Sequence, residues 1–140
     1  MSLVWTIDLA NYDQTTLLEE ADRKYFDHTL MLMSCYRNPS STFRRYPGRY
    51  SLILILHHVK EFKSKLKQIP FCTVYPDFVG QNTPREVIRY MMKKILAEFG
   101  DKTRVYPHVG ELSSRSTVRF ILGAVKESML NRALQDSGLF

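Results

Sequence analysis

Five consecutive apolar residues, Leu52-Ile53-Leu54-Ile55-Leu56, form the longest apolar run in the chain. A strand in the middle of a parallel sheet has this pattern, because both of its faces are covered. The residues after the run recur at helical spacing: Val59, Phe62, Leu66 and Ile69. We therefore expect a strand through about Leu56 and a helix from about His58. The alternative is one continuous helix over residues 50–69.

Segments typical of strands and helices alternate along the rest of the chain. Strands are expected at residues 3–9, 71–75 and 103–106, where β-branched and aromatic residues gather. Helices are expected from residues 13–16 to about 35, over residues 84–100, and from about residue 114 onward. This order predicts an α/β fold in a single domain, residues 1–140, with four short, mostly parallel strands alternating with four helices. If residues 50–69 form one helix, the fold is instead mainly α with a small three-stranded sheet.

The helix expected at residues 84–100 has the clearest boundaries. Thr83 is a good N-cap, Pro84 fits the first helical position, and Glu86 completes a capping box. A similar box, Thr16 with Glu19, is expected to start the first helix. The face expected to be buried in residues 84–100 consists of Val87, Ile88, Met91, Ile95, Leu96 and Phe99. In the last helix the corresponding residues are Val118, Ile121, Leu122, Val125 and Leu130.

Composition limits the class of protein. Hydrophobic residues make up 44% of the 140 residues and charged residues 24%, which are values typical of a globular chain. The longest apolar run is far too short to cross a membrane. Two cysteines are too few for a disulfide scaffold, so we expect an intracellular, reducing compartment such as the cytoplasm or nucleus. The opening Met1-Ser2-Leu3 is also compatible with a domain excised from a larger chain.

Residues 36–50 interleave arginines with aromatic residues. The arginines are Arg37, Arg44, Arg45 and Arg49, and the aromatic residues are Tyr36, Phe43, Tyr46 and Tyr50. Pro39 and Pro47 favour an irregular, exposed loop. Guanidinium groups bind phosphates and aromatic rings stack on bases, so this composition suits a single-stranded nucleic acid. The same residue types are also enriched in protein interfaces.

The formal net charge of +6 strengthens that interpretation. Basic residues recur on the outer faces of the expected helices, most regularly at Arg85, Arg89 and Lys93. We therefore predict a non-enzymatic domain that binds RNA or single-stranded DNA, with no catalytic residues, cofactor or metal. The alternative is a protein interaction subunit or structural adaptor that binds an acidic protein surface through the same loop.

A metal-dependent nuclease is the second alternative. Asp8 lies at the end of the first expected strand and Asp77 follows the strand expected at residues 71–75, where acidic side chains could hold Mg²⁺. This arrangement resembles the layout of PIN-like nucleases at the level of the fold only. His57 and His58 are adjacent and so point apart, which argues against a shared metal. Neither GxGxxG nor GxxxxGK[ST] occurs in the sequence, which argues against a glycine-rich phosphate cradle.

Overall fold

The computed structural model describes residues 2–16, 23–37, 51–99 and 103–138. The chain is an α/β protein with a three-stranded parallel sheet, so the predicted fold class is confirmed. Its contacts divide it into two compact units. One unit contains the sheet and the last helix, and the other contains the remaining helices. None of the helices in the described part is long and apolar enough to cross a lipid bilayer.

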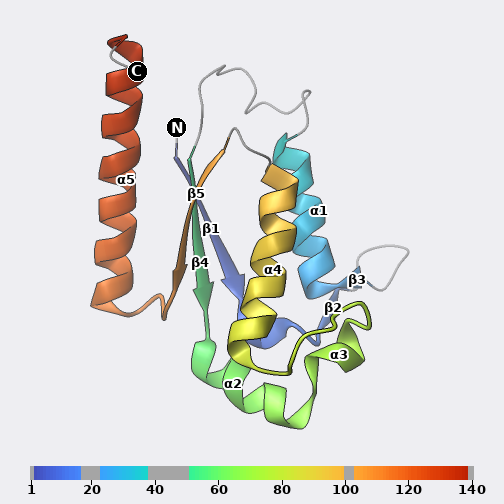
Figure 1. Cartoon of the computed structure of the whole chain (residues 1–140). Coiled ribbons are helices and arrows are strands. Elements are labelled where there is room, and N and C mark those ends of the chain that lie inside the picture. Colours follow the sequence, from blue (N-terminus) through green and yellow to red (C-terminus); the bar gives the residue numbers. More distant parts are fainter. Residues whose placement is uncertain (1, 17–22, 38–50, 100–102, 139–140) are drawn as a thin grey trace. The chain divides into compact units, whose positions relative to one another are not determined.

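The sheet unit has β4 (Ser51–His57) between β1 (Ser2–Asp8) and β5 (Arg104–Val109), as Figure 1 shows. β4 and β5 are parallel, with Ser51 opposite Arg104 and Leu56 opposite Val109. Residues 51–56 are all buried. The prediction that the apolar run is a buried central strand is therefore confirmed.

The last helix, α5 (Arg115–Asp136), packs against β4 and β5. Ile53, Ile55 and Ala124 form the centre of this interface. The hydroxyl of Ser128 donates to that of Ser51 across it, at 2.8 Å. Part of the predicted buried face is wrong: Val118, Leu122 and Leu130 are 48%, 55% and 60% exposed. The helix is apolar on more than one side, so spacing alone could not identify the face that packs.

The helical unit contains α1 (Tyr25–Arg37), α2 (Val59–Gln68), α3 (Phe71–Val74) and α4 (Pro84–Phe99). It also contains η1 (Leu9–Asn11), a single 3₁₀ turn, and a small antiparallel pair, β2 (Thr15–Thr16) with β3 (Arg23–Lys24). α1 and α4 run side by side (Figure 1). Val87, Met91, Ile95 and Phe99 on α4 are buried as predicted, whereas Leu96 is 48% exposed.

Three predicted elements differ from the structure. The first helix begins at Tyr25 and not at residues 13–16, because the backbone N–H of Tyr25 donates to the carbonyl of Gln14 and closes the β2–β3 pair. Residues 71–74 are helical and not a strand. β5 continues through Pro107, which is tolerated because β5 is an edge strand with one side free of ladder hydrogen bonds.

Aromatic side chains form the core around α3. Phe71 is fully buried and stacks on Tyr75, with ring centroids 4.8 Å apart. It also contacts Tyr12, Phe78 and Tyr90 at 5.6, 5.1 and 5.6 Å. Residues 71 and 75 are one helical turn apart, so a short helix brings both rings to one side.

Candidate functional site

Polar side chains meet where η1 approaches α2 in the helical unit. Asp8, the last residue of β1, accepts a hydrogen bond from the backbone N–H of Ala10 at 2.9 Å and so caps η1. Its second carboxylate oxygen lies 2.9 Å from Nδ1 of His58. The backbone N–H of Asp8 donates to the hydroxyl of Tyr25 at 3.1 Å. Asp8 therefore connects η1, α1 and the residue that precedes α2.

His58 adopts an unusual backbone conformation between β4 and α2. Its φ of 60° and ψ of 43° lie in the left-handed region, and no other non-glycine residue of the described ranges has a positive φ. This conformation costs an ordinary L-residue about 1–2 kcal/mol. The carbonyl of His58 accepts a hydrogen bond from the N–H of Phe62 and so begins α2. The turn therefore directs the imidazole toward Asp8 while it starts the helix.

Lys65 ties α2 to the segment that follows η1. Its ammonium group donates to the carbonyl of Ala10 at 2.7 Å and pairs with the carboxylate of Asp13 at 2.5 Å. It also lies 5.9 Å from the ring centroid of Tyr12. The Tyr12 hydroxyl donates to the carbonyl of Ile69. Burial, followed by the negative charge of Asp13, raises the pKa of Tyr12 to about 12.

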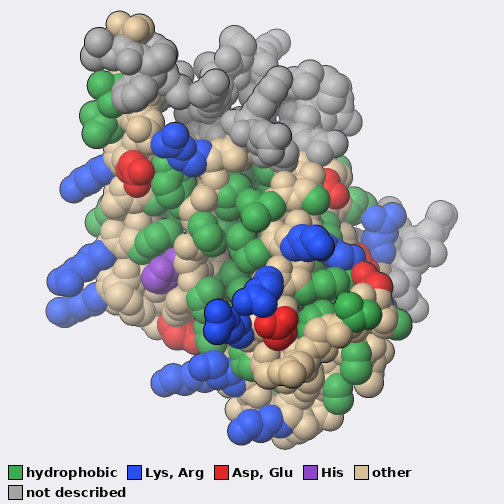
Figure 2. Space-filling model, viewed as in Figure 1, with side chains coloured by type: hydrophobic (Ala, Val, Ile, Leu, Met, Phe, Trp, Pro, Cys, Tyr) green, Lys and Arg blue, Asp and Glu red, His purple; other side chains and the backbone are tan. Residues whose placement is uncertain are grey.

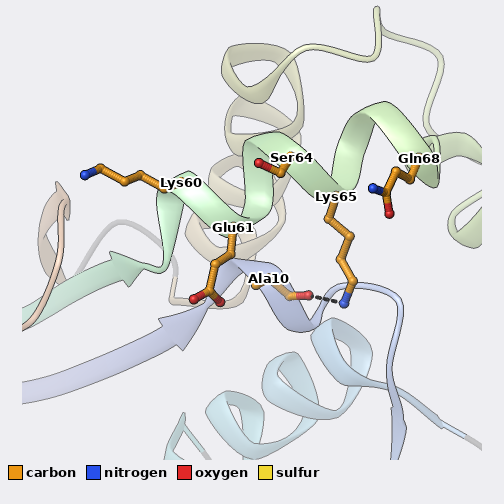
Figure 3. A pocket seen from close by; sticks show the side chains of 6 residues that line it. All are labelled: Ala10, Lys60, Glu61, Ser64, Lys65 and Gln68. Atoms are coloured by element: carbon orange, nitrogen blue, oxygen red, sulfur yellow. Dashed lines mark hydrogen bonds between the residues drawn. The ribbon is translucent and has the colours of Figure 1, made fainter.

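A pocket of about 400 Å³ lies between these elements. Ala10 of η1 forms one wall, and the other is the polar face of α2: Lys60, Glu61, Ser64, Lys65 and Gln68 (Figure 3). The figure shows Glu61, Lys65 and Gln68 extending from α2 to the side where η1 lies. The pocket offers a carboxylate, a hydroxyl, an amide and ammonium groups, so it suits a small polar molecule with both donors and acceptors. Among the residues of the described ranges, no group of three metal-ligating side chains is present.

The sheet unit offers a second tight turn, between β5 and α5. The N–H of Gly110 donates to the carbonyl of Leu56, which holds this turn against the carboxyl end of β4. A side chain at Gly110 would lie 2.8 Å from both the His108 imidazole and the Thr117 hydroxyl. The His108 ring stacks on Phe120 at 4.4 Å. Ligands of open parallel sheets bind outside the carboxyl ends of the strands, where this turn lies.

The predicted nucleic-acid-binding residues fall into three groups. Tyr36 and Arg37 belong to the last turn of α1, and the loop residues Phe43, Arg44, Arg45, Tyr46, Arg49 and Tyr50 lie outside the described ranges. On α4, Arg85, Arg89 and Lys93 are exposed, and Arg89 pairs with Glu86 at 2.9 Å. Figure 2 shows the basic side chains of α5 projecting separately at the left of the view, with other side chains between them.

The predicted pair of metal-binding acids is not formed. Asp77 follows α3 and not a strand, and it accepts hydrogen bonds from the Tyr90 hydroxyl at 2.7 Å and from Lys94 at 3.0 Å. These two hydrogen bonds lower the pKa of Asp77. The carboxylate of Asp8 accepts a hydrogen bond from the N–H of Ala10 and lies against the imidazole of His58. The acids therefore belong to two separate local networks.

Sequence reasoning missed the α2 face and the role of Lys65. Residues 61, 64, 65 and 68 are spaced by three or four and so share one side of a helix. That side is polar, which is most often typical of a helix face in contact with solvent. The polar stripe on this helix could be read from the sequence. The position of η1, which forms the opposite wall of the pocket, depends on the fold and could not be predicted.

Known proteins similar to this chain are guanine nucleotide-binding proteins. This chain is 33% identical over 138 residues to the alpha-3 subunit of such a protein from Neurospora crassa. The match covers 99% of this chain and 37% of the relative. Identity is 30% over 138 residues with an alpha subunit from Cryptococcus neoformans (99% of this chain, 31% of the relative). It is 28% over 137 residues with the alpha-2 subunit from Saccharomyces cerevisiae (98% and 29%). The chain thus spans about a third of the length of the curated relatives it matches. No family model matches it.

These similarities overturn the functional prediction made from composition. The relatives are named as nucleotide-binding subunits, so the prediction of a non-enzymatic domain that binds RNA or single-stranded DNA is wrong. The predicted partners, a nucleic acid or an acidic protein surface, are wrong for the same reason. Neither alternative, the interaction adaptor or the metal-dependent nuclease, matches the relatives. Net charge reports attraction to anions in general, so it could not distinguish a nucleotide from a nucleic acid.

Proposed function

We propose that this chain functions as part of a guanine nucleotide-binding alpha subunit, with a guanine nucleotide as its ligand and the companion subunits of such a protein as its partners. The observation that carries the proposal is the similarity itself, which extends over 138 of the 140 residues. A match of that extent includes every described helix and strand. It therefore concerns the whole arrangement of the chain and not a short motif.

The fold supports a nucleotide ligand. Parallel α/β sheets bind nucleotides at the carboxyl ends of their strands. In the sheet unit, β4 ends at His57, and the Gly110 turn is hydrogen-bonded to the carbonyl of Leu56 beside it. The turn leads directly into α5, whose first N–H groups are suited to an anionic group. We place the contact with the nucleotide at this end of the sheet.

The phosphate groups of the nucleotide require additional binding residues. GxxxxGK[ST], whose backbone and lysine hold the phosphates in P-loop proteins, does not occur in these 140 residues. About two thirds of the length of the relatives lies outside the match. We therefore expect the 140-residue chain to recognise the nucleotide weakly, with a dissociation constant of roughly 10 µM to 1 mM.

We also propose that the protein works inside the cell. Cys35 and Cys72 are both exposed and unpaired. Exposed thiols persist in a reducing compartment and oxidise outside it. This location agrees with a nucleotide ligand that is abundant in the cytoplasm.

Competition between nucleotides tests the proposal. A fluorescent GDP analogue is titrated with the 140-residue protein and then displaced by unlabelled GDP or ADP. These two competitors carry the same ribose and phosphates, so any difference between them comes from the base. We expect GDP to displace the probe at a concentration at least tenfold lower than ADP. Equal displacement, or no detectable binding at about 1 mM probe, would overturn the proposal.

A further inference from the structure

We propose that the helical unit binds an anionic lipid bilayer through the outer face of α4, with lysines of α2 adding to the attraction. Two parallel ridges of side chains define this face. The basic ridge consists of Arg85, Arg89 and Lys93. The apolar ridge consists of Ile88, Met92 and Leu96. Residues of one ridge are four apart and the ridges are offset by three, so they lie side by side along the helix.

Both ridges are accessible from outside the fold. All three side chains of the basic ridge are exposed. In the apolar ridge, Ile88 and Met92 are half-buried and Leu96 is 48% exposed. The fully packed side of α4 is a different one, formed by Val87, Met91, Ile95 and Phe99. Aliphatic surface therefore remains in contact with water directly beside the basic side chains.

The fold neutralises little of the positive charge on this face. In the described part of the chain, no acidic side chain pairs with Arg85 or Lys93. Arg89 pairs with Glu86, yet its side chain is still 61% exposed. Lys94 lies on another side of α4, where it is bound to Asp77, and so does not belong to the face. The basic ridge can therefore contact external phosphates.

α2 adds three more exposed lysines. It packs against α4, and its Lys60, Lys63 and Lys67 are separated by three and four residues, so they share one side of the helix. None of the three forms an ion pair with a residue of the described ranges. Figure 2 shows basic side chains over α4 and over α2 on one face of the helical unit. A broad anionic surface can attract both helices together.

The residue types on this face favour a bilayer. Tryptophan and tyrosine, which anchor protein interfaces and stack on nucleic-acid bases, are present in neither ridge. Basic residues beside aliphatic ones are typical of helices that lie in the headgroup layer, where the aliphatic chains reach the acyl boundary and the charges bind lipid phosphates. α4 has 16 residues and is about 24 Å long, so a flat surface can contact its whole length.

Vesicle flotation tests the proposal. The 140-residue protein is mixed with vesicles of phosphatidylcholine alone, or with vesicles that also contain about 30% phosphatidylserine. We expect the bound fraction to require at least tenfold less lipid when phosphatidylserine is present. The advantage should decline as the salt concentration rises from about 50 to 500 mM, because screening shortens the range of the attraction. No nucleotide is added, so the result is independent of the proposed function.

Paired substitutions locate the contact. Arg85→Gln with Lys93→Gln removes two charges from the face. This pair should weaken binding about tenfold to thirtyfold, because each basic residue near an anionic bilayer contributes about fivefold. The control, Arg119→Gln with Lys126→Gln, removes the same charge from exposed positions of α5 and should weaken binding less than threefold. Leu96→Gln should weaken binding about threefold to tenfold by the same factor at both salt concentrations.

Equal binding to both kinds of vesicle would overturn the proposal. It would also be overturned if the α5 pair weakened binding as much as the α4 pair. Binding to soluble polyglutamate without binding to vesicles would assign the face to a macromolecule and refute the bilayer. Circular dichroism verifies that each variant is folded. If Leu96→Gln is not, Leu96→Ala replaces it, since alanine favours the helix and still removes most of the aliphatic surface.

Discussion

Phe71 is the side chain whose removal tests the helical unit most severely. It is fully buried on a helix of only four residues, and four aromatic rings surround it: those of Tyr12, Tyr75, Phe78 and Tyr90. Phe71→Ala removes the central ring and leaves a cavity that these stiff neighbours cannot fill. We therefore expect a large loss of stability with little change of secondary structure.

The size of the loss can be calculated in two ways. Burying a phenylalanine removes about 150–250 Å² from water, which at about 25 cal/mol per Å² corresponds to roughly 4–6 kcal/mol. Measured substitutions of buried phenylalanine by alanine cost about 3–5 kcal/mol, including the cavity. We expect a loss of about 4 kcal/mol, which is a large part of the roughly 5–15 kcal/mol that stabilises a typical domain.

Urea denaturation followed by far-ultraviolet circular dichroism measures this loss. Val79→Ala is the matched control, because Val79 lies in the same region and is 97% exposed. The control should change the free energy of unfolding by less than about 0.5 kcal/mol. Phe71→Leu, which refills part of the cavity, should fall between the two. A loss below about 1 kcal/mol for Phe71→Ala would show that Phe71 is not packed at the centre of these rings.

Two further predictions concern charge and backbone space. Asp77→Asn should destabilise the protein by at most about 1 kcal/mol at pH 7, because the pair is largely exposed. Since the hydrogen bonds of Tyr90 and Lys94 lower the pKa of Asp77, its contribution is present at neutral pH and lost as the pH falls below about 4. The difference in melting temperature between parent and variant should then shrink steadily as the pH is lowered from 5 toward 2, and a difference that does not shrink would contradict this origin. Gly110→Ala should cost about 1–3 kcal/mol, because its Cβ would meet two packed side chains at 2.8 Å. Gly123→Ala, in α5 with open space around it, should instead stabilise the protein by about 0.5–1 kcal/mol. If both substitutions shift the melting temperature in the same direction, the difference in space around the two glycines is not the cause.

The elements that were predicted correctly differ in how clear their local chemistry is. The Thr83-Pro84 start of α4 admits one interpretation, because helix capping requires particular residues. The apolar run of β4 was also compatible with a continuous helix over residues 50–69, and its burial on both faces in the sheet identifies the strand. In α3 the local signal favoured a strand, and tertiary packing decided otherwise. Phe71 and Tyr75 are buried whereas Thr73 is exposed. That spacing of four is helical, since a strand would place residue 73 on the same side as both rings.

The candidate site was only partly predictable, because it depends on contacts between distant segments. Asp8 was expected at the end of a strand and His58 at the start of a helix, yet nothing in the sequence indicates that their side chains lie 2.9 Å apart. Lys65 appeared as one of several lysines on a helix. Its partners, Ala10 and Asp13, are more than 50 residues away in the chain. Local sequence patterns predict which residues share one face of a helix. Which distant residues contact that face is determined by the fold.

The failure of the nucleic-acid prediction has a physical cause in the described part of the chain. A cation and an aromatic ring attract each other whether the ring belongs to a base or to a tyrosine. Lys24, Lys65 and Lys94 each lie 4.9–5.9 Å from the centroid of a tyrosine ring in the helical unit. Each also donates to the protein itself: Lys24 to a backbone carbonyl, Lys65 to a carbonyl and a carboxylate, and Lys94 to a carboxylate. Some of the lysines and tyrosines therefore interact with each other and with other groups inside the fold. A count of charges consequently overstates how many basic side chains remain for an external ligand.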